Sequence, residues 1–82
     1  MKEGYHLTEI PKGKLGTRSK IQEEYLEWVD SCKQGCKVME LVELSDLLGA
    51  IEHYTKNNYN ISLTDLVKMN NITQRTFKNG RR

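Results

Sequence analysis

The sequence contains two acidic motifs whose spacing could assemble a metal site. One is E-E-x-x-E beginning at Glu23, and the other is E-x-x-D beginning at Glu43. Each holds two carboxylates three residues apart, Glu24 with Glu27 and Glu43 with Asp46, and that spacing places both on one side of a helix. Two such helices packed face to face would bring four carboxylates to one point. Because like charges repel, a cation is expected among them, and oxygen ligands with room for water suit Mg²⁺ or Mn²⁺.

Helical periodicity predicts the elements that would position these motifs. Ser19 followed by Gln22 fits a capping box, which places the start of a first helix at Ser19. Gly35 is expected to end this helix, and a second helix is expected from about Lys37 to Thr55. The two acidic motifs therefore lie on consecutive helices.

Two shorter helices are expected after an asparagine-rich turn at residues 57–60. Ser62 would cap a third helix that runs to about Asn70. Thr73 would cap a last helix that ends at Gly80.

The protein is predicted to be all-α, because no segment alternates like a strand with turn residues at its ends. Its 82 residues make one small domain, near the size at which a single-chain core becomes marginal. Residues 1–18, with one proline and three glycines, are expected to form an irregular arm, and residues 19–82 the helical domain. Two long and two short helices would complete a four-helix-bundle core only by oligomerisation.

The second helix is expected to be apolar on two faces. One broad face consists of aliphatic side chains, namely Leu41, Leu44, Leu47, Leu48 and Ile51. Glu43 and Asp46 lie on a separate strip that they share with Met39, Ala50 and Tyr54. A carboxylate on such a strip is costly unless a proton, a base or a metal neutralises it. We therefore favour a functional role for Glu43 and Asp46.

The first helix is less decisive. Its expected buried stripe consists of Ile21, Tyr25, Trp28, Val29 and Cys32, with Glu24 at the border. For Glu23, Asp30 and Glu40, a solvated charged face and a functional role remain equally open.

Charge is partitioned along the sequence, although the net charge is only +2. Residues 1–20 carry five Lys or Arg against two Glu, residues 21–65 carry three Lys against nine acids, and residues 66–82 carry five Lys or Arg and no acid. An acidic middle between basic ends suits a metal site that receives a polyanion, and equally suits basic tails that keep the protein soluble.

Composition argues against a membrane protein and against a secreted one. No apolar run is long enough to cross a bilayer, and the N-terminus lacks the apolar region of a secretory signal. Cys32 and Cys36 have no partner ligands for a zinc site. A reduced, cytoplasmic protein is expected.

The acidic motifs resemble the signature of the all-α nucleoside triphosphate pyrophosphohydrolases, the MazG-like group. The first motif, E-E-x-x-E, is followed by fifteen residues and then by E-x-x-D, and the likeness covers Ser19 to Tyr54. The arm KGKLGTRSKIQEE and the tail TQRTFKNGRR are similar to short MazG-like proteins encoded by phages. The resemblance implies metal-dependent hydrolysis of a nucleoside triphosphate, usually a deoxynucleotide, to the monophosphate and pyrophosphate.

Roles for individual residues follow from the same resemblance. Glu24, Glu27, Glu43 and Asp46 would ligate Mg²⁺, and Glu23 would support the site or orient water. The phosphates would be bound by basic and amide side chains of a later segment, namely Lys68, Asn71, Arg75 and Lys78. MazG-like proteins are dimers or tetramers, so a homodimer or homotetramer is expected. The base, the sugar and the biological role stay open.

Two other functions fit parts of the sequence. The segment from Ser62 to Arg82 is compatible with a helix–turn–helix that binds nucleic acid, with Gln74 and Arg75 on a recognition helix. That helix would be short and the middle of the sequence is acidic, which makes a nucleic-acid partner the weaker hypothesis. A non-enzymatic helical module that binds another protein is the third, and it predicts no dependence on metal.

Overall fold

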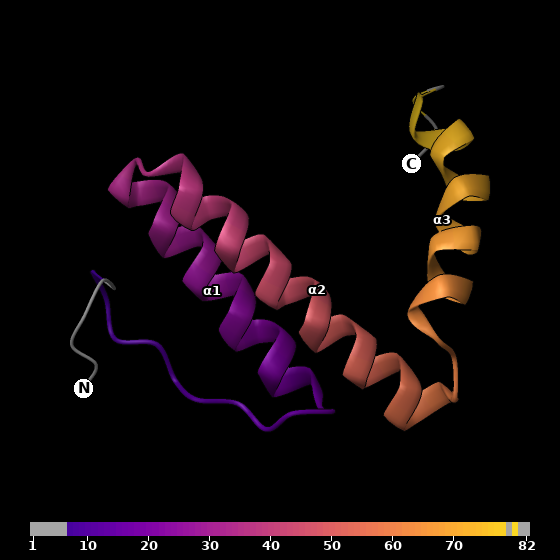
Figure 1. Ribbon diagram of the computed structural model, residues 1–82, viewed down its shortest axis with the longest axis horizontal. Helices are drawn as coiled ribbons and strands as arrows, with labels where there is room; N and C mark the ends of the chain where they lie inside the picture. Colours follow the sequence, from indigo (N-terminus) through magenta and orange to yellow (C-terminus); the bar gives the residue numbers. More distant parts are fainter. Residues whose placement is uncertain (1–6, 79, 81–82) are drawn as a thin grey trace.

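The computed structural model describes residues 7–78 and residue 80, and of residues 75–77 it describes the backbone alone. Three helices follow one another along this part of the protein: α1 (Arg18–Gln34), α2 (Lys37–Tyr59) and α3 (Leu63–Lys78). The described residues contain no strand, which confirms the all-α prediction. α1 and α2 run side by side as an antiparallel hairpin, and α3 projects from the far end of α2 (Figure 1). None of the helices in this part of the protein has the length and apolar character needed to span a membrane.

Gly35 ends α1, as predicted, and makes the tight connection to α2. Its φ of 75° is in the left-handed region that favours glycine, and its N–H donates to Cys32 O at 3.1 Å. The start of α1 differs from the prediction, because Thr17 rather than Ser19 is the residue before the first helical turn. The Ser19 hydroxyl instead accepts a hydrogen bond from the Lys14 N–H at 3.0 Å, so it holds the arm rather than the helix terminus.

α2 continues four residues beyond its expected end at Thr55. Asn58 lies inside the helix, where its side-chain amide donates to Tyr54 O at 2.9 Å and to Gly16 O at 3.0 Å. This contact with the arm offsets the weak helix propensity of asparagine. Asn60, with a φ of 55°, then ends the helix in the left-handed conformation.

α3 is one continuous helix, and the expectation of two short helices in this segment is wrong. Ser62 does cap it, because its hydroxyl accepts the Asp65 N–H at 3.1 Å. Thr73 does not start a second helix, since its hydroxyl donates back to Asn70 O at 3.2 Å within the same helix. No glycine or proline interrupts residues 63–78, and asparagine alone is too weak a breaker to end a helix.

The seam between α1 and α2 is built from the acidic strip of α2 and not from its leucine face. Glu43 and Ala50 of α2 are buried there, with Glu43 fully inaccessible to solvent. The leucine face is open instead, with 67% of Leu41 and 49% of Leu48 exposed. Leu44, at 42%, is also on the open side. These three leucines therefore do not serve the seam within one protomer, whereas Leu47 and Ile51 of the same face are half-buried.

The expected apolar stripe of α1 is not buried by the hairpin either. Tyr25 and Cys32 are exposed, and Ile21, Trp28 and Val29 are half-buried. The buried residues of α1 are polar, namely Glu23, Glu24, Asp30 and Ser31. The prediction failed because the sequence pattern of α1 does not reveal the arm, which covers one side of this helix.

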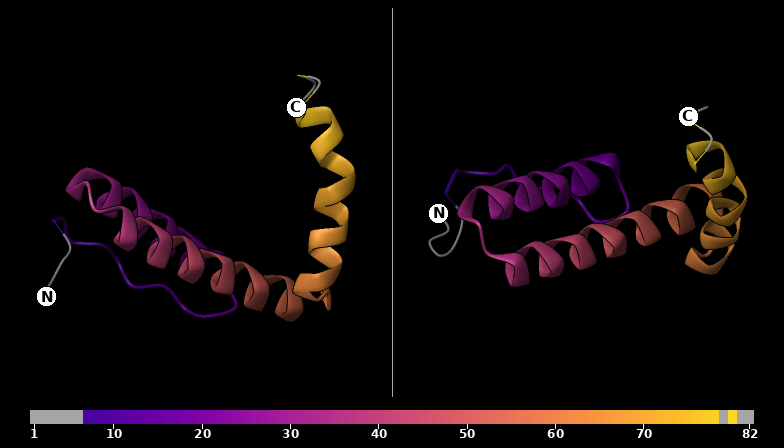
Figure 2. Two further views of the ribbon diagram at one scale, coloured as in Figure 1. Left: turned by 45° about the horizontal axis from the view of Figure 1, so that its top comes forward. Right: turned by 90° about the horizontal axis from the view of Figure 1, so that it is seen from above.

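The arm at residues 7–17 contains no helix and runs back along α1 (Figure 2). The Asp30 carboxylate, only 2% exposed, accepts the N–H of Leu7 at 2.9 Å and that of Thr8 at 3.1 Å. The Glu23 carboxylate accepts the Gly13 N–H at 2.8 Å. Gly13 is required at this contact, because a Cβ there would collide with the Ser19 carbonyl. Buried carboxylates thus fasten the arm to α1, which excludes a solvated charged face for Glu23 and Asp30.

Candidate metal centre

The structure brings the four predicted ligands together across the α1–α2 seam. Glu24 and Glu27 project from α1, and Glu43 and Asp46 from α2. One carboxylate oxygen from each residue lies within 4.8 Å of those of the other three. Each helix contributes two residues three positions apart, so the cluster follows directly from helical spacing once the helices pack antiparallel.

The cluster is closed on one side and open on the other. Glu43 and Glu24 are buried, Glu27 is half-buried and Asp46 is exposed. A ligand from solvent could therefore approach at the Asp46 side, while Glu43 stays in the interior of the seam. Oxygen Oε1 of Glu24 is buried and makes no hydrogen bond among the described residues, which leaves one acceptor of this ligand residue unsatisfied.

The electrostatic cost of this arrangement is visible at Glu27. Burial, together with the nearby carboxylates of Glu24 and Glu43, raises the pKa of Glu27 from 4.5 to about 8. A hydrogen bond between the Glu27 and Glu43 carboxyl groups acts in the same direction. At neutral pH the cluster without a cation therefore retains a proton, and a cation would neutralise the same charge.

The ligand set and its size fit a hard divalent cation. Four carboxylate oxygens and no nitrogen or sulfur are the donors that Mg²⁺, Mn²⁺ and Ca²⁺ prefer. Oxygens on opposite sides of a Mg²⁺ ion are about 4.2 Å apart. The four oxygens, all within 4.8 Å of one another, are therefore close to the spread that one such ion requires.

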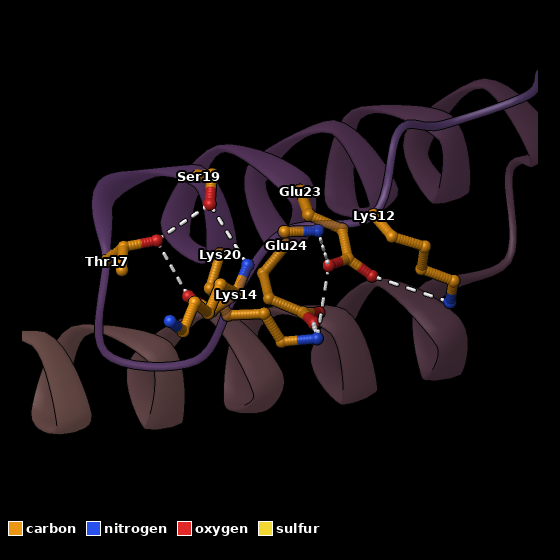
Figure 3. Close-up of polar contacts among 8 residues, drawn as sticks. Lys12, Lys14, Thr17, Ser19, Lys20, Glu23 and Glu24 are labelled. Atoms are coloured by element: carbon orange, nitrogen blue, oxygen red, sulfur yellow. Dashed lines mark hydrogen bonds and ion pairs between the residues drawn. The ribbon is translucent and has the colours of Figure 1, made fainter.

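Lys20 provides the positive charge next to the cluster. Its Nζ lies 3.1 Å from Glu24 Oε2 and 3.1 Å from Glu23 Oε1, so it bridges the two carboxylates (Figure 3). The hydrogen bond to Glu24 raises the pKa of Lys20 and keeps the ammonium charged. Sequence reasoning missed this residue, although the spacing of four residues between Lys20 and Glu24 is the usual signal of a helical ion pair.

Glu23 lies beside the four carboxylates rather than among them. Burial opposes its ionisation, but the Gly13 N–H and the Lys20 ammonium outweigh burial, so the pKa of Glu23 is lowered. Its second oxygen faces Lys12 Nζ at 3.6 Å. Both oxygens of Glu23 thus contact the arm or Lys20. Of the two roles expected for Glu23, these contacts fit support of the site better than orientation of a water molecule.

The predicted phosphate-binding residues all lie on α3, away from the cluster of their own protomer. Among the described residues, α3 contacts the end of α2 and makes no contact with α1. Lys68, Asn71 and Lys78 are exposed, and the side chain of Arg75 lies outside the described residues. The hairpin and α3 therefore do not bring these residues to the carboxylates within a single protomer (Figure 1).

Comparisons with family models, with characterised proteins and with solved structures return no match for this protein. The resemblance to the MazG-like group therefore stays a prediction from the sequence motifs.

Proposed function

We propose that this protein is a metal-dependent nucleoside triphosphate pyrophosphohydrolase that releases the monophosphate and pyrophosphate. The observation that supports the proposal is the convergence of Glu24, Glu27, Glu43 and Asp46 within 4.8 Å. These are the four acids that the E-E-x-x-E and E-x-x-D motifs assign to metal ligation. Mg²⁺ or Mn²⁺ is the cation that such a set would hold.

The proposed reaction suits the residues present. A bound cation would neutralise the triphosphate and polarise the attacking water, so no side-chain nucleophile is required. The four carboxylates would hold the cation, with Asp46 on the side that faces solvent. Lys20 lies where it could exchange its contact with Glu24 for a phosphate oxygen once a cation neutralises Glu24.

The experiment is a panel of canonical and modified nucleoside triphosphates, incubated with Mg²⁺ and scored for monophosphate and pyrophosphate. Glu43→Gln and Asp46→Asn should each abolish turnover with helical content preserved, because each removes a ligand at nearly constant volume. Glu52→Gln is the matched control, since Glu52 lies on α2 outside the cluster. Full activity in either ligand variant or in excess EDTA would contradict the proposal, and a diphosphate as the main product would indicate ordinary phosphatase chemistry.

The proposed active form is a homodimer or homotetramer. The leucine face of α2, where Leu41, Leu44 and Leu48 are all more than two-fifths exposed, is an apolar surface of the kind that marks a protein–protein contact. Pairing this face between protomers would build the four-helix core. Light scattering should show an oligomer that Leu41→Glu disrupts. Ser45→Glu, on the polar side of α2, is the control and should leave the oligomer intact. A monodisperse 9.5 kDa monomer would contradict the proposed assembly.

The same assembly would let α3 of one protomer serve the carboxylates of another, since the described part of α3 does not contact α1 of its own protomer. Mixing an Asp46→Asn protein with an Arg75→Ala protein tests this arrangement. Recovered activity would support a shared site, and no recovery would favour a site built within one protomer.

The two alternative functions have less support. A helix–turn–helix needs a turn near Asn71, whereas the backbone is helical from Leu63 to Lys78. A non-enzymatic interaction module remains the outcome expected if neither metal nor any nucleotide affects the protein.

A further inference from the structure

A polar recess lies at the open end of the α1–α2 seam. It has a volume of about 470 Å³ and is formed by residues 16–19, where the arm enters α1, and by Tyr54, Asn57 and Asn58 of α2. None of these lining residues is acidic, and Arg18 gives the recess a positive charge. The recess thus differs in charge from the carboxylate cluster farther along the seam.

The side chains of the recess are held in place. Arg18 Nε donates to the Tyr54 hydroxyl at 3.5 Å, and the Tyr59 ring packs edge-on against the Tyr54 ring with centroids 5.8 Å apart. The side-chain amides of Asn57 and Asn58 both donate to Gly16 O, at 3.2 Å and 3.0 Å. Because the amide nitrogen of each side chain is engaged as a donor, this contact fixes the orientation of both side chains and leaves their oxygens as acceptors.

The recess and the carboxylate cluster lie on the same side of α2, one after the other along the seam. Tyr54 follows Asp46 by eight residues, which is a rise of about 12 Å along α2. It also follows Glu43 by eleven residues, and that spacing returns to the same side of a helix. Ala50, buried between them, keeps the two helices in contact. On α1, Lys20 lies one turn before Glu24 and contacts its carboxylate. A nucleotide has a polyanionic end and an aromatic end, and its length is comparable to this rise of about 12 Å along α2.

We propose that this recess binds the nucleoside part of the substrate, an inference that rests on the proposed hydrolysis at the carboxylate cluster. The base stacks on the partly exposed Tyr54 ring, as bases do on aromatic side chains in sequence-tolerant sites. The amide oxygens of Asn57 and Asn58 accept hydrogen bonds from an exocyclic amino group. Cytosine, adenine and guanine carry such a group, whereas thymine and uracil offer only a ring N–H to the two oxygens, so the first three bases should be preferred.

The first test is binding to the full-length protein in excess EDTA, with nucleoside monophosphates as the probes and NMR as the readout. dCMP, dAMP and dGMP should shift the Tyr54 ring and the side-chain amides of Asn57 and Asn58, and dTMP should bind at least about fivefold more weakly. Inorganic phosphate at equal concentration separates the base from the phosphate. Equal shifts from phosphate alone, or none in the recess from any nucleotide, would overturn the proposal.

The second test separates this proposal from the hydrolysis itself. Tyr54→Ala should raise KM for the preferred triphosphate about tenfold while release of pyrophosphate still requires Mg²⁺. Tyr54→Phe, which keeps the ring, should stay within about threefold of the unmodified protein. His53→Ala is the control, since this exposed neighbour does not line the recess. Asn57→Ala, which leaves the Asn58 contact with Gly16 in place, should reduce discrimination against thymine without reducing helical content.

The outcomes distinguish the two proposals. Turnover with unchanged KM and base preference in both Tyr54→Ala and Asn57→Ala would overturn the recess and leave the hydrolase assignment intact. If no triphosphate is hydrolysed but monophosphates still shift the recess residues, the hydrolase assignment fails and nucleoside binding stands.

Discussion

Binding of a cation to the carboxylate cluster should be strongly linked to pH, and Glu27 is the residue through which the linkage acts. Without a cation its pKa is raised to about 8 by burial and by the carboxylates of Glu24 and Glu43, so this carboxyl group is protonated at neutral pH. A metal ligand must be deprotonated, and a binding cation must therefore displace this proton.

The size of the effect follows from the number of protons released. With one proton displaced per cation, the association constant rises tenfold for each pH unit below the pKa of Glu27 and levels off above it. From pH 6 to pH 8 the affinity for Mn²⁺ should increase by roughly 50-fold. The sign is fixed by the direction of the shift: a raised carboxyl pKa makes the metal-free form hold the proton, so acid weakens binding.

Calorimetric titration of Mn²⁺ in two buffers with different ionisation enthalpies measures both the affinity and the protons released. The unmodified protein should release close to one proton per ion at pH 7. Glu27→Gln should bind more weakly and lose the dependence on pH in this range, whereas Glu52→Gln should behave like the unmodified protein. An affinity that changes less than about threefold from pH 6 to pH 8, with no proton released, would refute the reasoning.

Two further predictions concern the protein without metal. Its melting temperature should fall as pH rises from 5 to 8, because the folded state binds the Glu27 proton more tightly than the unfolded state does. If the raised pKa of this half-buried group changes the free energy of unfolding by about 1 kcal/mol, the melting temperature should fall by about 4–8 °C. Glu27→Gln should remove this fall. An equal fall in Glu27→Gln would contradict the role of Glu27. Asp30→Ala should release the arm, because it removes the charged acceptor of the Leu7 and Thr8 N–H groups at a cost of about 1–3 kcal/mol. Trypsin should then cut after Lys12 at least about fivefold faster, and rates equal to those of Glu52→Ala would show that Asp30 does not hold the arm.

The sequence predicted those parts of the structure that depend on helical spacing or on a single strong residue. The pairing of Glu24 with Glu27 and of Glu43 with Asp46 is a local property of each helix, so it could be expected before the helices were placed. Gly35 was predictable because the left-handed conformation at a helix end favours glycine.

The parts that failed depend on contacts between distant segments. Glu23 and Asp30 are buried where the backbone N–H groups of the arm donate to their carboxylates. The pattern of side-chain types in a sequence does not predict such backbone donors. The length of α2 depends on Asn58, whose contact with Gly16 links residues 42 positions apart. The leucine face could be recognised as apolar, but whether it faced α1 or solvent was not encoded in its own residues.

The hairpin places charged groups where a small domain normally places its apolar core. Ala50 is the buried apolar residue of the described part of the protein, while three glutamates, an aspartate, a serine and a threonine are also buried. Buried carboxylates near one another oppose folding unless something neutralises them, and the exposed leucine face of α2 contributes nothing until something covers it. A cation at the cluster and a second protomer on the leucine face would remove these two costs separately. Folding, assembly and metal binding should therefore be thermodynamically coupled.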